Sequence, residues 1–382
     1  MRTEFEPATE NAALKESLVA RIESQGPITF RDFMETALYH PQYGYYRSRR
    51  EKMGREGDYL TSPEVSSSFG VLVGRQLREM WQAMSTPSPF AIVEVGAGTG
   101  ALCRDILRWA GRHAPDFRHA LTYTIVEVSD ALVERQRTVL ADTGEEIRWS
   151  TDLPDGVEGC VLTNELLDSF PVHRVTAQGG KLVEVFVGWD GSRFVEELRP
   201  PSTGEIEAYF GRLSLMPGEG CRAEVNLAAR EWMQRAGHAL RRGFLLAFDY
   251  GYEARDLYAP WRTDGTLLCF YRHNPSVDPY ARLGRQDITS HVDFTTLRQA
   301  AEEVGLQTLA LVSQSEFLTN LGIGEALAPP GEGDVNLEEF YARRRAVSEL
   351  VDPTALGRIR VLVMTKGVER PRLTGLEGLP ND

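Results

Sequence analysis

Three glycines stand between an apolar run and a stretch of helical periodicity. Gly96, Gly98 and Gly100 follow the strand-like residues 90–95 and precede a predicted helix at 101–110. Glycine allows a sharp backbone turn and lets a ligand approach without a Cβ in the way, and the start of a helix supplies free N–H groups. This arrangement predicts a cofactor-binding loop, with a plain strand-to-helix turn as the alternative.

Two classes of cofactor are compatible with this loop. With Ala101 in the last place, the glycines also satisfy the dinucleotide pattern G-x-G-x-x-[G/A]. Glu94 separates the classes, because its carboxylate would attract the cationic amino-acid end of S-adenosylmethionine and repel a pyrophosphate. Glu127, at the end of the next predicted strand at 122–128, suits the two ribose hydroxyls, unless it simply faces solvent. We therefore expect S-adenosylmethionine as the cofactor.

A second polar group follows the fourth predicted strand, 159–163. Asn164 and Glu165 come directly after its apolar residues, and Asp168 lies three positions further on. Ligands of open α/β sheets bind beyond the carboxyl ends of the strands, so these residues would face the transferred methyl group. If 165–168 forms one helical turn, the two carboxylates share a face and can hold a guanidinium. The alternative is a helix-capping Asn or Asp beside a surface Glu.

Alternating strand and helix patterns place these residues in an α/β fold with a parallel sheet and right-handed crossovers. The alternation breaks at a predicted β-hairpin within 172–198, which a helical pattern at 223–241 follows. We predict five segments: an N-terminal helical cap with a cofactor-covering loop (1–89), a Rossmann-like cofactor-binding half (90–171), an inserted hairpin and helical subdomain (172–242), the remainder of the sheet (243–368) and a flexible tail (369–382).

Composition narrows the class of protein further. The net charge of −13 over 382 residues argues against a nucleic-acid partner. No apolar run approaches the roughly 18–20 residues that cross a bilayer. Residues 1–17 have neither the apolar core of a signal peptide nor the Arg-rich character of a mitochondrial presequence. The four cysteines contain no C-x-x-C pair, which argues against a metal site. We expect a cytoplasmic protein without metal.

The motifs together resemble the MidA family of S-adenosylmethionine-dependent methyltransferases, which is related to the mitochondrial complex I assembly arginine methyltransferase. The matching segments cover nearly the whole chain and are 26–30, 40–46, 57–64, 69–70, 94–100, 164–168, 249–251, 287–294 and 317–318, with Pro171 and Gln314. The resemblance implies a Rossmann-like class I methyltransferase sheet with an N-terminal helical cap and an inserted α+β subdomain. It also implies a protein arginine as methyl acceptor, with a respiratory-complex subunit among the possible partners.

The resemblance gives a meaning to segments outside the predicted sheet. Thr61, Pro63 and Glu64 would belong to a loop folded over the cofactor, which Asn164 would also contact; a surface turn with a helix cap is the alternative for the loop. His291 could accept a proton after methyl transfer, since its unperturbed pKa is near 6.5, although a lone histidine is more often structural.

Three functional hypotheses follow. The first is a protein arginine methyltransferase. The second is a largely non-catalytic assembly factor that grips a partner protein, and the third is a small-molecule methyltransferase. A homodimer is also possible, because Val185, Phe186, Val187 and Trp189 could form a dimer edge; the alternative is that they pack on the core.

Overall fold

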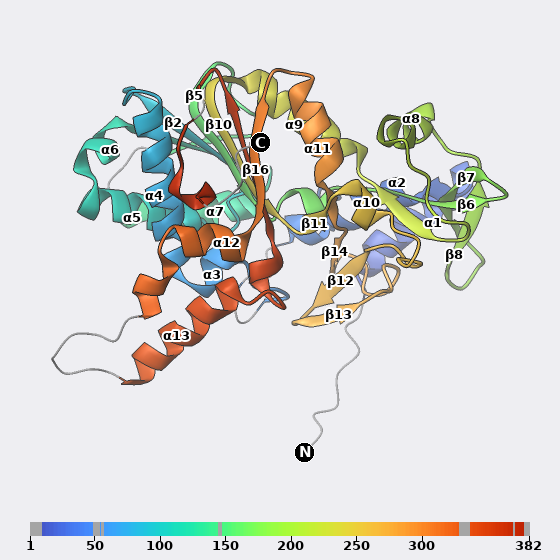
Figure 1. Ribbon diagram of the computed structural model, residues 1–382. Coiled ribbons are helices and arrows are strands. Elements are labelled where there is room, and N and C mark those ends of the chain that lie inside the picture. The colour runs from blue at the N-terminus through green and yellow to red at the C-terminus, as the bar shows by residue number, and fades with distance from the viewer. Residues whose placement is uncertain are drawn as a thin grey trace. The chain divides into compact units, whose positions relative to one another are not determined.

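The computed structural model describes residues 10–48, 54, 57–143, 147–327, 337–369 and 371–377. The chain divides into two compact units, each assembled from separate stretches of sequence (Figure 1). Unit 1 comprises Met1–Tyr59, Leu167–Arg230 and Tyr252–Thr296, and unit 2 comprises Leu60–Leu166, Glu231–Gly251 and Leu297–Asp382. The five-segment division follows chain order and stays a prediction. Its residues 1–9 and 378–382 lie outside the described residues.

Among the described residues, unit 2 contains a seven-stranded sheet in the order β16-β17-β10-β5-β2-β3-β4. Its strands are β2 (Phe90–Val95), β3 (Leu121–Val126), β4 (Ile147–Ser150), β5 (Val157–Asn164), β10 (Leu240–Asp249), β16 (Gln307–Ser313) and β17 (Arg360–Lys366). The five strands β10, β5, β2, β3 and β4 are parallel to one another. Strand β17 is antiparallel to both of its neighbours, β10 and β16. The predicted α/β class with a mostly parallel sheet is confirmed.

The register of this sheet gathers its loops at one edge. Val95 of β2 lies opposite Thr163 of β5, and Asn164 of β5 lies opposite Phe248 of β10. The loops that follow these parallel strands therefore leave the sheet at the same level. This carboxyl edge is where open α/β sheets bind ligands.

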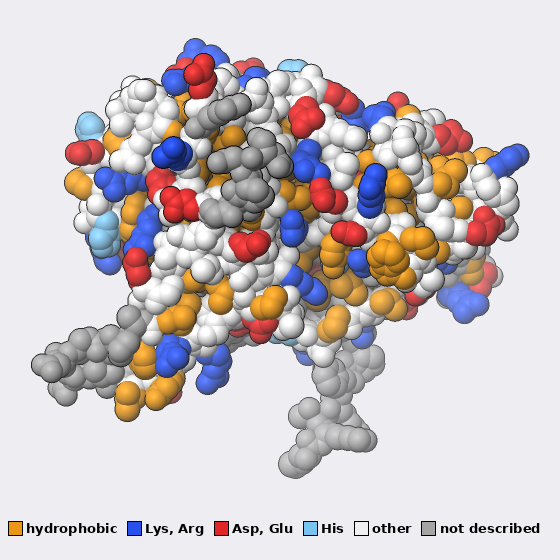
Figure 2. All heavy atoms as spheres, in the orientation of Figure 1, with side chains coloured by type: hydrophobic (Ala, Val, Ile, Leu, Met, Phe, Trp, Pro, Cys, Tyr) orange, Lys and Arg blue, Asp and Glu red, His pale blue; other side chains and the backbone are white. Residues whose placement is uncertain are grey.

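Unit 2 also contains helices and 3-10 turns, two of which begin in unit 1. They are α3 (Ser62–Val65), α4 (Ser67–Ala83), α5 (Ala101–His113), α6 (Pro115–Ala120), α7 (Asp130–Leu140), η2 (Ala141–Thr143), α9 (Leu227–Ala239), α11 (Phe294–Glu302), α12 (Gln314–Asn320), η4 (Ile323–Leu327), α13 (Leu337–Val351), η5 (Leu356–Arg358) and η6 (Thr374–Leu376). The rings of Phe69, Phe248 and Phe317 meet edge to face in the core between α4, β10 and α12. The last helix, α13, buries Val347 and Leu350 but exposes its first turns, over which hydrophobic and basic side chains lie together (Figure 2).

Part of the predicted flexible tail is ordered. Leu373 is buried, and the backbone N–H and hydroxyl of Thr374 donate hydrogen bonds to Glu79. Residues 371–377 therefore pack within unit 2. Composition alone suggested fraying because these residues are polar and contain Pro and Gly.

Unit 1 contains a five-stranded sheet among its described residues. The sheet has the order β1-β7-β6-β9, with β8 paired to β7. The elements that lie wholly or partly in unit 1 are α1 (Ala12–Gln25), β1 (Ile28–Thr29), α2 (Phe30–Tyr39), η1 (Tyr45–Arg47), η3 (Leu167–Ser169), β6 (His173–Gln178), β7 (Lys181–Trp189), β8 (Phe194–Arg199), α8 (Gly204–Leu213), β9 (Arg222–Val225), β11 (Gly251–Tyr252), α10 (Ala254–Leu257), β12 (Leu268–Tyr271), β13 (Asn274–Ser276), β14 (Asp287–Thr289) and β15 (Val292–Asp293). The predicted hairpin is present as β6 and β7, which pair antiparallel.

The predicted helix at 223–241 is wrong at its start. Residues 222–225 form β9, which pairs with β6 and buries Ala223 and Val225. The helix begins at Leu227, where the side chain of Asn226 accepts a hydrogen bond from the Ala229 N–H at 2.8 Å. Pairing with a distant strand therefore overrides the local helical periodicity.

Strand β7 lies inside the sheet of unit 1. It pairs with β6 and also with β1 and β8, and the side chains of Val185 and Val187 are fully buried. These valines therefore pack on the core, which is the second of the two alternatives for this strand. In the part of the chain that the structure describes, no helix combines the length and apolarity that a membrane crossing requires.

Candidate functional site

The glycine loop after β2 has a backbone that only glycine adopts readily. Gly96, Gly98 and Gly100 have φ angles of 69°, 54° and 86°, all in the left-handed region. A Cβ on Gly96 would lie 2.8 Å from Cδ1 of Leu166. The loop therefore presents main-chain groups where side chains would otherwise stand, and it leads directly into the first turn of α5.

Glu127, directly after β3, has both carboxylate oxygens held by the protein. Oε1 accepts hydrogen bonds from the N–H groups of Val128 and Ser129, both at 2.9 Å, and Oε2 accepts one from Gln136 Nε2 at 3.2 Å. These contacts fix the carboxylate at the carboxyl end of the second strand. Its predicted contact with ribose hydroxyls stays a prediction.

Gln136 of α7 connects three parts of this region and was missed by sequence reasoning. Its Nε2 also donates to the Gly98 carbonyl at 2.9 Å, and its Oε1 accepts from the indole N–H of Trp149 at 3.0 Å. The side chain is fully buried. The available signal was an amide at a position of α7 that faces the glycine loop, but periodicity alone gives no reason to expect its partners.

Glu94 is buried within the sheet. Its Oε2 accepts a 2.6 Å hydrogen bond from the hydroxyl of Tyr123 on β3, and the residue is 2% exposed. Burial raises the pKa of Glu94 to about 7, and the Tyr123 hydrogen bond partly offsets this rise. The predicted contact of Glu94 with the cationic end of the cofactor therefore stays a prediction, since the carboxylate is engaged with Tyr123.

The segment 61–64 lies against the glycine loop. Thr61 precedes the first turn of α3, and its carbonyl accepts the Glu64 N–H at 2.9 Å. The Glu64 carboxylate in turn accepts a hydrogen bond from the hydroxyl of Thr99, inside the loop. Ser62 is fully buried, whereas Pro63 and Glu64 are half-buried in the short helix α3 that begins at Ser62. The cofactor roles of Thr61, Pro63 and Glu64 remain predictions, but Glu64 is a carboxylate placed at the loop.

Glu165 stands at the end of β5 in a constrained conformation. Its φ is 50°, in the left-handed region, and its N–H donates to the Phe248 carbonyl at 2.8 Å. Its Oε1 accepts hydrogen bonds from Asn164 Nδ2 at 3.0 Å and from the Ser62 N–H at 3.2 Å. The backbone and the carboxylate are thus both held, by segments that are far apart in the sequence.

The charge state of Glu165 follows from this environment. Burial raises the pKa of Glu165 to about 8, although the hydrogen bonds from Asn164 and Ser62 lower it, and the charge of Asp249 raises it further. A carboxyl group with this pKa keeps its proton near neutral pH until a cation arrives. A guanidinium, which stays charged, would favour the ionised carboxylate.

Asp249 is the second acidic residue at this edge of the sheet, and sequence reasoning assigned it no role. It is fully buried at the end of β10, where Oδ2 accepts the Leu166 N–H at 3.2 Å and Oδ1 accepts the Tyr250 N–H at 2.8 Å. Asp249 therefore holds the backbone N–H of Leu166, the residue directly after Glu165. The sequence signal was an acid directly after an apolar strand, the same pattern that drew attention to Glu165.

Asp168 does not share a helical turn with Glu165, so that premise is wrong. Glu165 has a left-handed φ, and the 3-10 turn η3 begins only at Leu167. Asp168 belongs to unit 1, where its carbonyl accepts the Ser290 N–H at 2.9 Å. The contacts that hold Glu165 in this conformation come from distant segments and could not be foreseen from spacing alone. A catalytic role for Asp168 remains a prediction without this geometric support.

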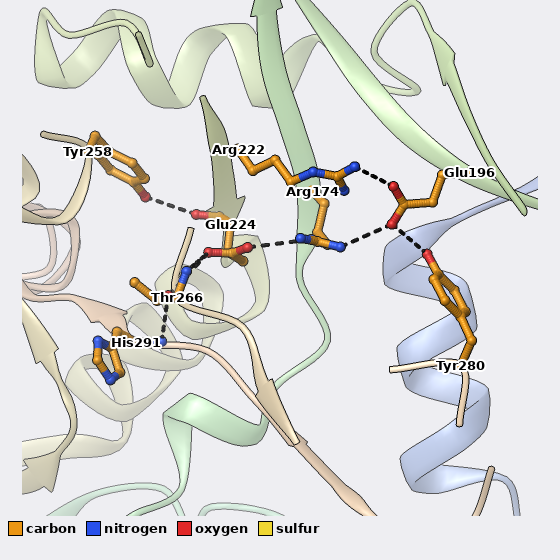
Figure 3. A network of polar contacts seen from close by, with 8 residues as sticks. All are labelled: Arg174, Glu196, Arg222, Glu224, Tyr258, Thr266, Tyr280 and His291. Carbon is orange, nitrogen blue, oxygen red and sulfur yellow. Dashed lines mark hydrogen bonds and ion pairs between the residues drawn. The ribbon is translucent and has the colours of Figure 1, made fainter. Parts of the chain in front are cut away.

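His291 also belongs to unit 1, where it borders a polar network (Figure 3). The backbone N–H of His291 donates to the Thr266 hydroxyl at 3.0 Å, and the backbone N–H of Thr266 donates to the Glu224 carboxylate at 2.7 Å. The His291 ring lies 5.3 Å from the ring of Tyr252, centre to centre. Its predicted role in proton transfer remains a prediction.

The rest of this network consists of buried and half-buried ion pairs. Arg174 contacts Glu224 at 3.4 Å and donates to Glu196 at 3.2 Å, and Glu196 also accepts from Arg222 and from Tyr280. Figure 3 shows these side chains pointing toward one another, and they come from β6, β8, β9 and the loop that contains Tyr280. They link β6, β8 and β9 within unit 1.

The residues of unit 2 fit S-adenosylmethionine. The glycine loop has left-handed φ angles that a side chain would strain, and Glu64 and Glu127 supply carboxylates that hydrogen bonds connect to the loop through Thr99 and Gln136. Asn164 Oδ1 is buried and has no hydrogen-bond partner among the described residues. A mostly parallel seven-stranded sheet with these residues at its carboxyl edge defines a class I S-adenosylmethionine-dependent methyltransferase. No group of side chains suited to a metal ion occurs among the described residues.

Comparison with known proteins identifies the family. Residues 72–312 match a family model described as "Putative S-adenosyl-L-methionine-dependent methyltransferase", and the chain belongs to this family. It is 31% identical to "Protein arginine methyltransferase NDUFAF7 homolog, mitochondrial" of Drosophila melanogaster, over 94% of this chain and 86% of that protein. It is 32% identical to "Protein arginine methyltransferase NDUFAF7, mitochondrial" of Homo sapiens, over 80% of this chain and 72% of that protein.

A solved structure supports the same assignment. A COG1565 superfamily member from Burkholderia thailandensis, bound to S-adenosyl-homocysteine, superposes with a TM-score of 0.87 at 32% identity. The match covers 96% of this chain and 95% of that chain. The predicted family, the class I methyltransferase fold and the S-adenosylmethionine cofactor are therefore confirmed.

The prediction of a cytoplasmic protein is contradicted by these relatives. The names of the fly, mouse and human proteins place them in mitochondria. That prediction rested on the absence of a presequence pattern in residues 1–17, of which 1–9 lie outside the described residues. A composition argument over so few residues carries little weight against the whole-length similarity.

Proposed function

We propose that this methyltransferase modifies an arginine side chain of a protein substrate and that Glu165 holds the acceptor guanidinium. The observation that carries the proposal is the position of the Glu165 carboxylate at the carboxyl end of β5, beside Asn164 and the end of β10. The relatives named as protein arginine methyltransferases support the same acceptor class.

The electrostatics of Glu165 favour a permanent cation as acceptor. A carboxyl group with a pKa of about 8 is largely protonated near neutral pH, and binding a neutral acceptor would not favour its ionised form. Binding a guanidinium would favour the ionised form, because the positive charge stabilises the carboxylate and the planar N–H groups can pair with both oxygens. The nearby charge of Asp249 adds to the negative potential that a guanidinium would meet.

The residues of unit 2 divide the work of binding. Gly96, Gly98 and Gly100 would lie along the cofactor, and Glu127 would accept its ribose hydroxyls. When bound, S-adenosylmethionine supplies the methyl group as an electrophile. Glu165 would hold the acceptor guanidinium beside it; the nitrogen would gain the methyl group and lose one proton to solvent, which leaves S-adenosylhomocysteine as the second product. Catalysis would then rest on proximity and electrostatics without a covalent enzyme intermediate.

The acceptor protein is the finer part of the proposal. The family resemblance suggests a respiratory-complex subunit, and a protein acceptor also suits the size of unit 1, which adds a second sheet beyond the methyltransferase core. A homodimer would have to use surfaces other than Val185 and Val187, which are buried within unit 1.

The experiment compares Glu165→Gln with the unchanged protein. Each is incubated with methyl-labelled S-adenosylmethionine and a soluble protein extract of its own source; labelled proteins are identified by mass spectrometry and hydrolysed to detect methylarginines. We expect methylarginine with the unchanged protein and a loss of about a hundred-fold or more with the variant, because one preorganised charged group is removed. Cofactor affinity, measured by calorimetry, should stay within about two-fold.

The control is Glu134→Gln, which changes an exposed glutamate of α7 and should leave transfer unchanged. Methylation of an amino acid other than arginine, or full activity of Glu165→Gln, would contradict the proposal. Normal maturation of a partner protein by an inactive Glu165→Gln variant would instead favour the assembly-factor hypothesis, and transfer to a low-molecular-weight acceptor would favour the small-molecule hypothesis.

A further inference from the structure

Glu165 receives its Ser62 hydrogen bond because a third residue holds Ser62 in place. The Ser62 hydroxyl donates to Gln314 Oε1 at 2.9 Å, while the Ser62 N–H donates to Glu165 Oε1 at 3.2 Å. Ser62 thus links the two side chains, through its hydroxyl to Gln314 and through its backbone N–H to Glu165. Both Ser62 and Gln314 are fully buried, so the path from Gln314 to the carboxylate is enclosed by protein.

Gln314 itself has little freedom to move. Its N–H donates to the Ile359 carbonyl at 2.7 Å, and its Nε2 donates to the Leu350 carbonyl at 3.0 Å. Because Nε2 must face a carbonyl, the acceptor Oε1 must face Ser62. The side-chain amide is therefore oriented by Leu350 of α13, while Ile359 holds the backbone of Gln314, and Oε1 of the amide accepts the Ser62 hydroxyl.

We propose that Gln314 is a positioning residue, which acts through Ser62 to hold a hydrogen-bond donor against the Glu165 carboxylate. This inference rests on the proposed function of Glu165 as the group that holds the acceptor. Gln314 touches neither acceptor nor cofactor in this account. It fixes where the carboxylate lies and how readily it carries its charge.

The direction of the effect follows from the contacts of Glu165. The Ser62 N–H lowers the pKa of Glu165, against the opposing effects of burial and of the titratable Asp249 on β10. If Gln314 or the Ser62 hydroxyl is lost, Ser62 keeps only the backbone hydrogen bonds of α3, and we expect its hydrogen bond to Glu165 to lengthen or break. The pKa of Glu165 should then rise further above its ordinary value.

The test measures the titration of Glu165 directly. The full chain is prepared with 13C-labelled glutamate carboxyl groups, and the Glu165 signal is identified as the one that disappears in Glu165→Gln. In Ser62→Ala and in Gln314→Leu we expect its midpoint to move upward by about half a pH unit or more. The double variant should shift no further than the larger single shift, because both changes break the same path.

A matched control separates positioning from general damage to α12. Asn320, at the other end of α12, donates from its side chain to the carbonyls of Gly375 and Glu377, and Asn320→Leu removes these contacts without touching Ser62. The Glu165 midpoint should not move in this control. A role that merely stabilises the fold would instead give equal unfolding losses and no shift in any of the variants.

Activity provides the second measurement. In Ser62→Ala we expect the rate of methyl transfer from labelled S-adenosylmethionine to the protein extract to fall about ten-fold, with S-adenosylmethionine affinity within about two-fold of the unchanged protein. If Gln314→Leu does not fold, Ser62→Ala alone decides the question, since it removes one hydroxyl and keeps the N–H group.

The two proposals fail in different ways. Full activity of Glu165→Gln would overturn the proposed function, and the positioning role of Gln314 and Ser62 would then have no effect on methyl transfer. An inactive Glu165→Gln together with an unmoved Glu165 midpoint in folded Ser62→Ala would overturn the positioning role of Gln314 alone.

Discussion

The backbone N–H of Leu166 donates a 3.2 Å hydrogen bond to the carboxylate of Asp249. Leu166 directly follows Glu165, and Asp249 is the last residue of the neighbouring strand β10. This contact ties the loop after β5 to the end of β10. It also places a second negative charge where it raises the pKa of Glu165. Asp249 therefore has two separable effects on the candidate site, one through the backbone and one through its charge.

An Asp249→Asn substitution should separate these effects. The amide side chain would keep an acceptor for the Leu166 N–H but remove the negative charge, so the pKa of Glu165 should fall from about 8 toward its ordinary value. Because kcat/KM reports ionisations of the free enzyme, its acid limb should move to lower pH. A pH profile identical to that of the unchanged protein would contradict this account, and Asp249→Ala, which also removes the acceptor, should lower kcat as well.

A Gly98→Val substitution should abolish cofactor binding. Gly98 has a φ of 54°, a conformation that a β-branched residue adopts only at a large cost. Calorimetry should detect no S-adenosylmethionine binding in this variant. The matched control is Gly111→Ala in α5, where the nearest atom to a new Cβ is 4.0 Å away, and there the affinity should be unchanged. Unchanged affinity in Gly98→Val would contradict the assignment of the loop.

A Gln136→Leu substitution should weaken cofactor binding without removing it. The change leaves the Gly98 carbonyl, Glu127 Oε2 and the Trp149 indole without their buried partner. We expect the Kd for S-adenosylmethionine to rise about ten-fold and the free energy of unfolding to fall by about 1–3 kcal/mol. Gln234→Leu, which removes a surface hydrogen bond to Glu303, serves as control. An unchanged Kd in Gln136→Leu would show that its three contacts matter for stability alone.

Glu94 should make the stability of the fold depend on pH. Burial raises the pKa of Glu94 in the folded state from its ordinary value of 4.5 to about 7, so the folded state binds a proton more tightly than the unfolded state. Its contribution to stability is therefore complete below about pH 4.5 and is lost as pH rises through about 7. The loss approaches about 3 kcal/mol for this buried group.

Urea unfolding of Glu94→Gln at about pH 5 and about pH 7.5 checks this sign. The variant should lose less stability between these two conditions than the unchanged protein does. Tyr123→Phe should act in the opposite direction, because it removes the hydrogen bond that lowers the pKa of Glu94. Equal losses in all three proteins would mean that Glu94 does not retain its proton on folding.

Much of the sheet could be predicted because its strands are short apolar runs between turn residues. The bounds of β2 agree with the predicted ones. The helix α4 was missed, partly because Gly70 and Gly74 interrupt its pattern. The structure shows why they are there: a Cβ at Gly70 would lie 2.5 Å from Cβ of Asp105, and one at Gly74 would lie 2.7 Å from the Trp109 ring. Close packing of α4 on α5 requires residues that local propensity disfavours.

The sequence by itself determined the glycine loop after β2, the class of fold and the position of Glu165 after β5, because each depends on neighbours along the chain. Glycine spacing, strand length and an acid after an apolar strand are local properties. Only the tertiary structure decided which residues hold Glu165. Ser62, Asp249 and Gln314 come from three stretches of sequence, and Asp168, the nearest candidate in sequence, does not share a helical turn with Glu165. Hydrogen bonds between distant segments depend on how strands and helices pack, and residue spacing does not encode that packing.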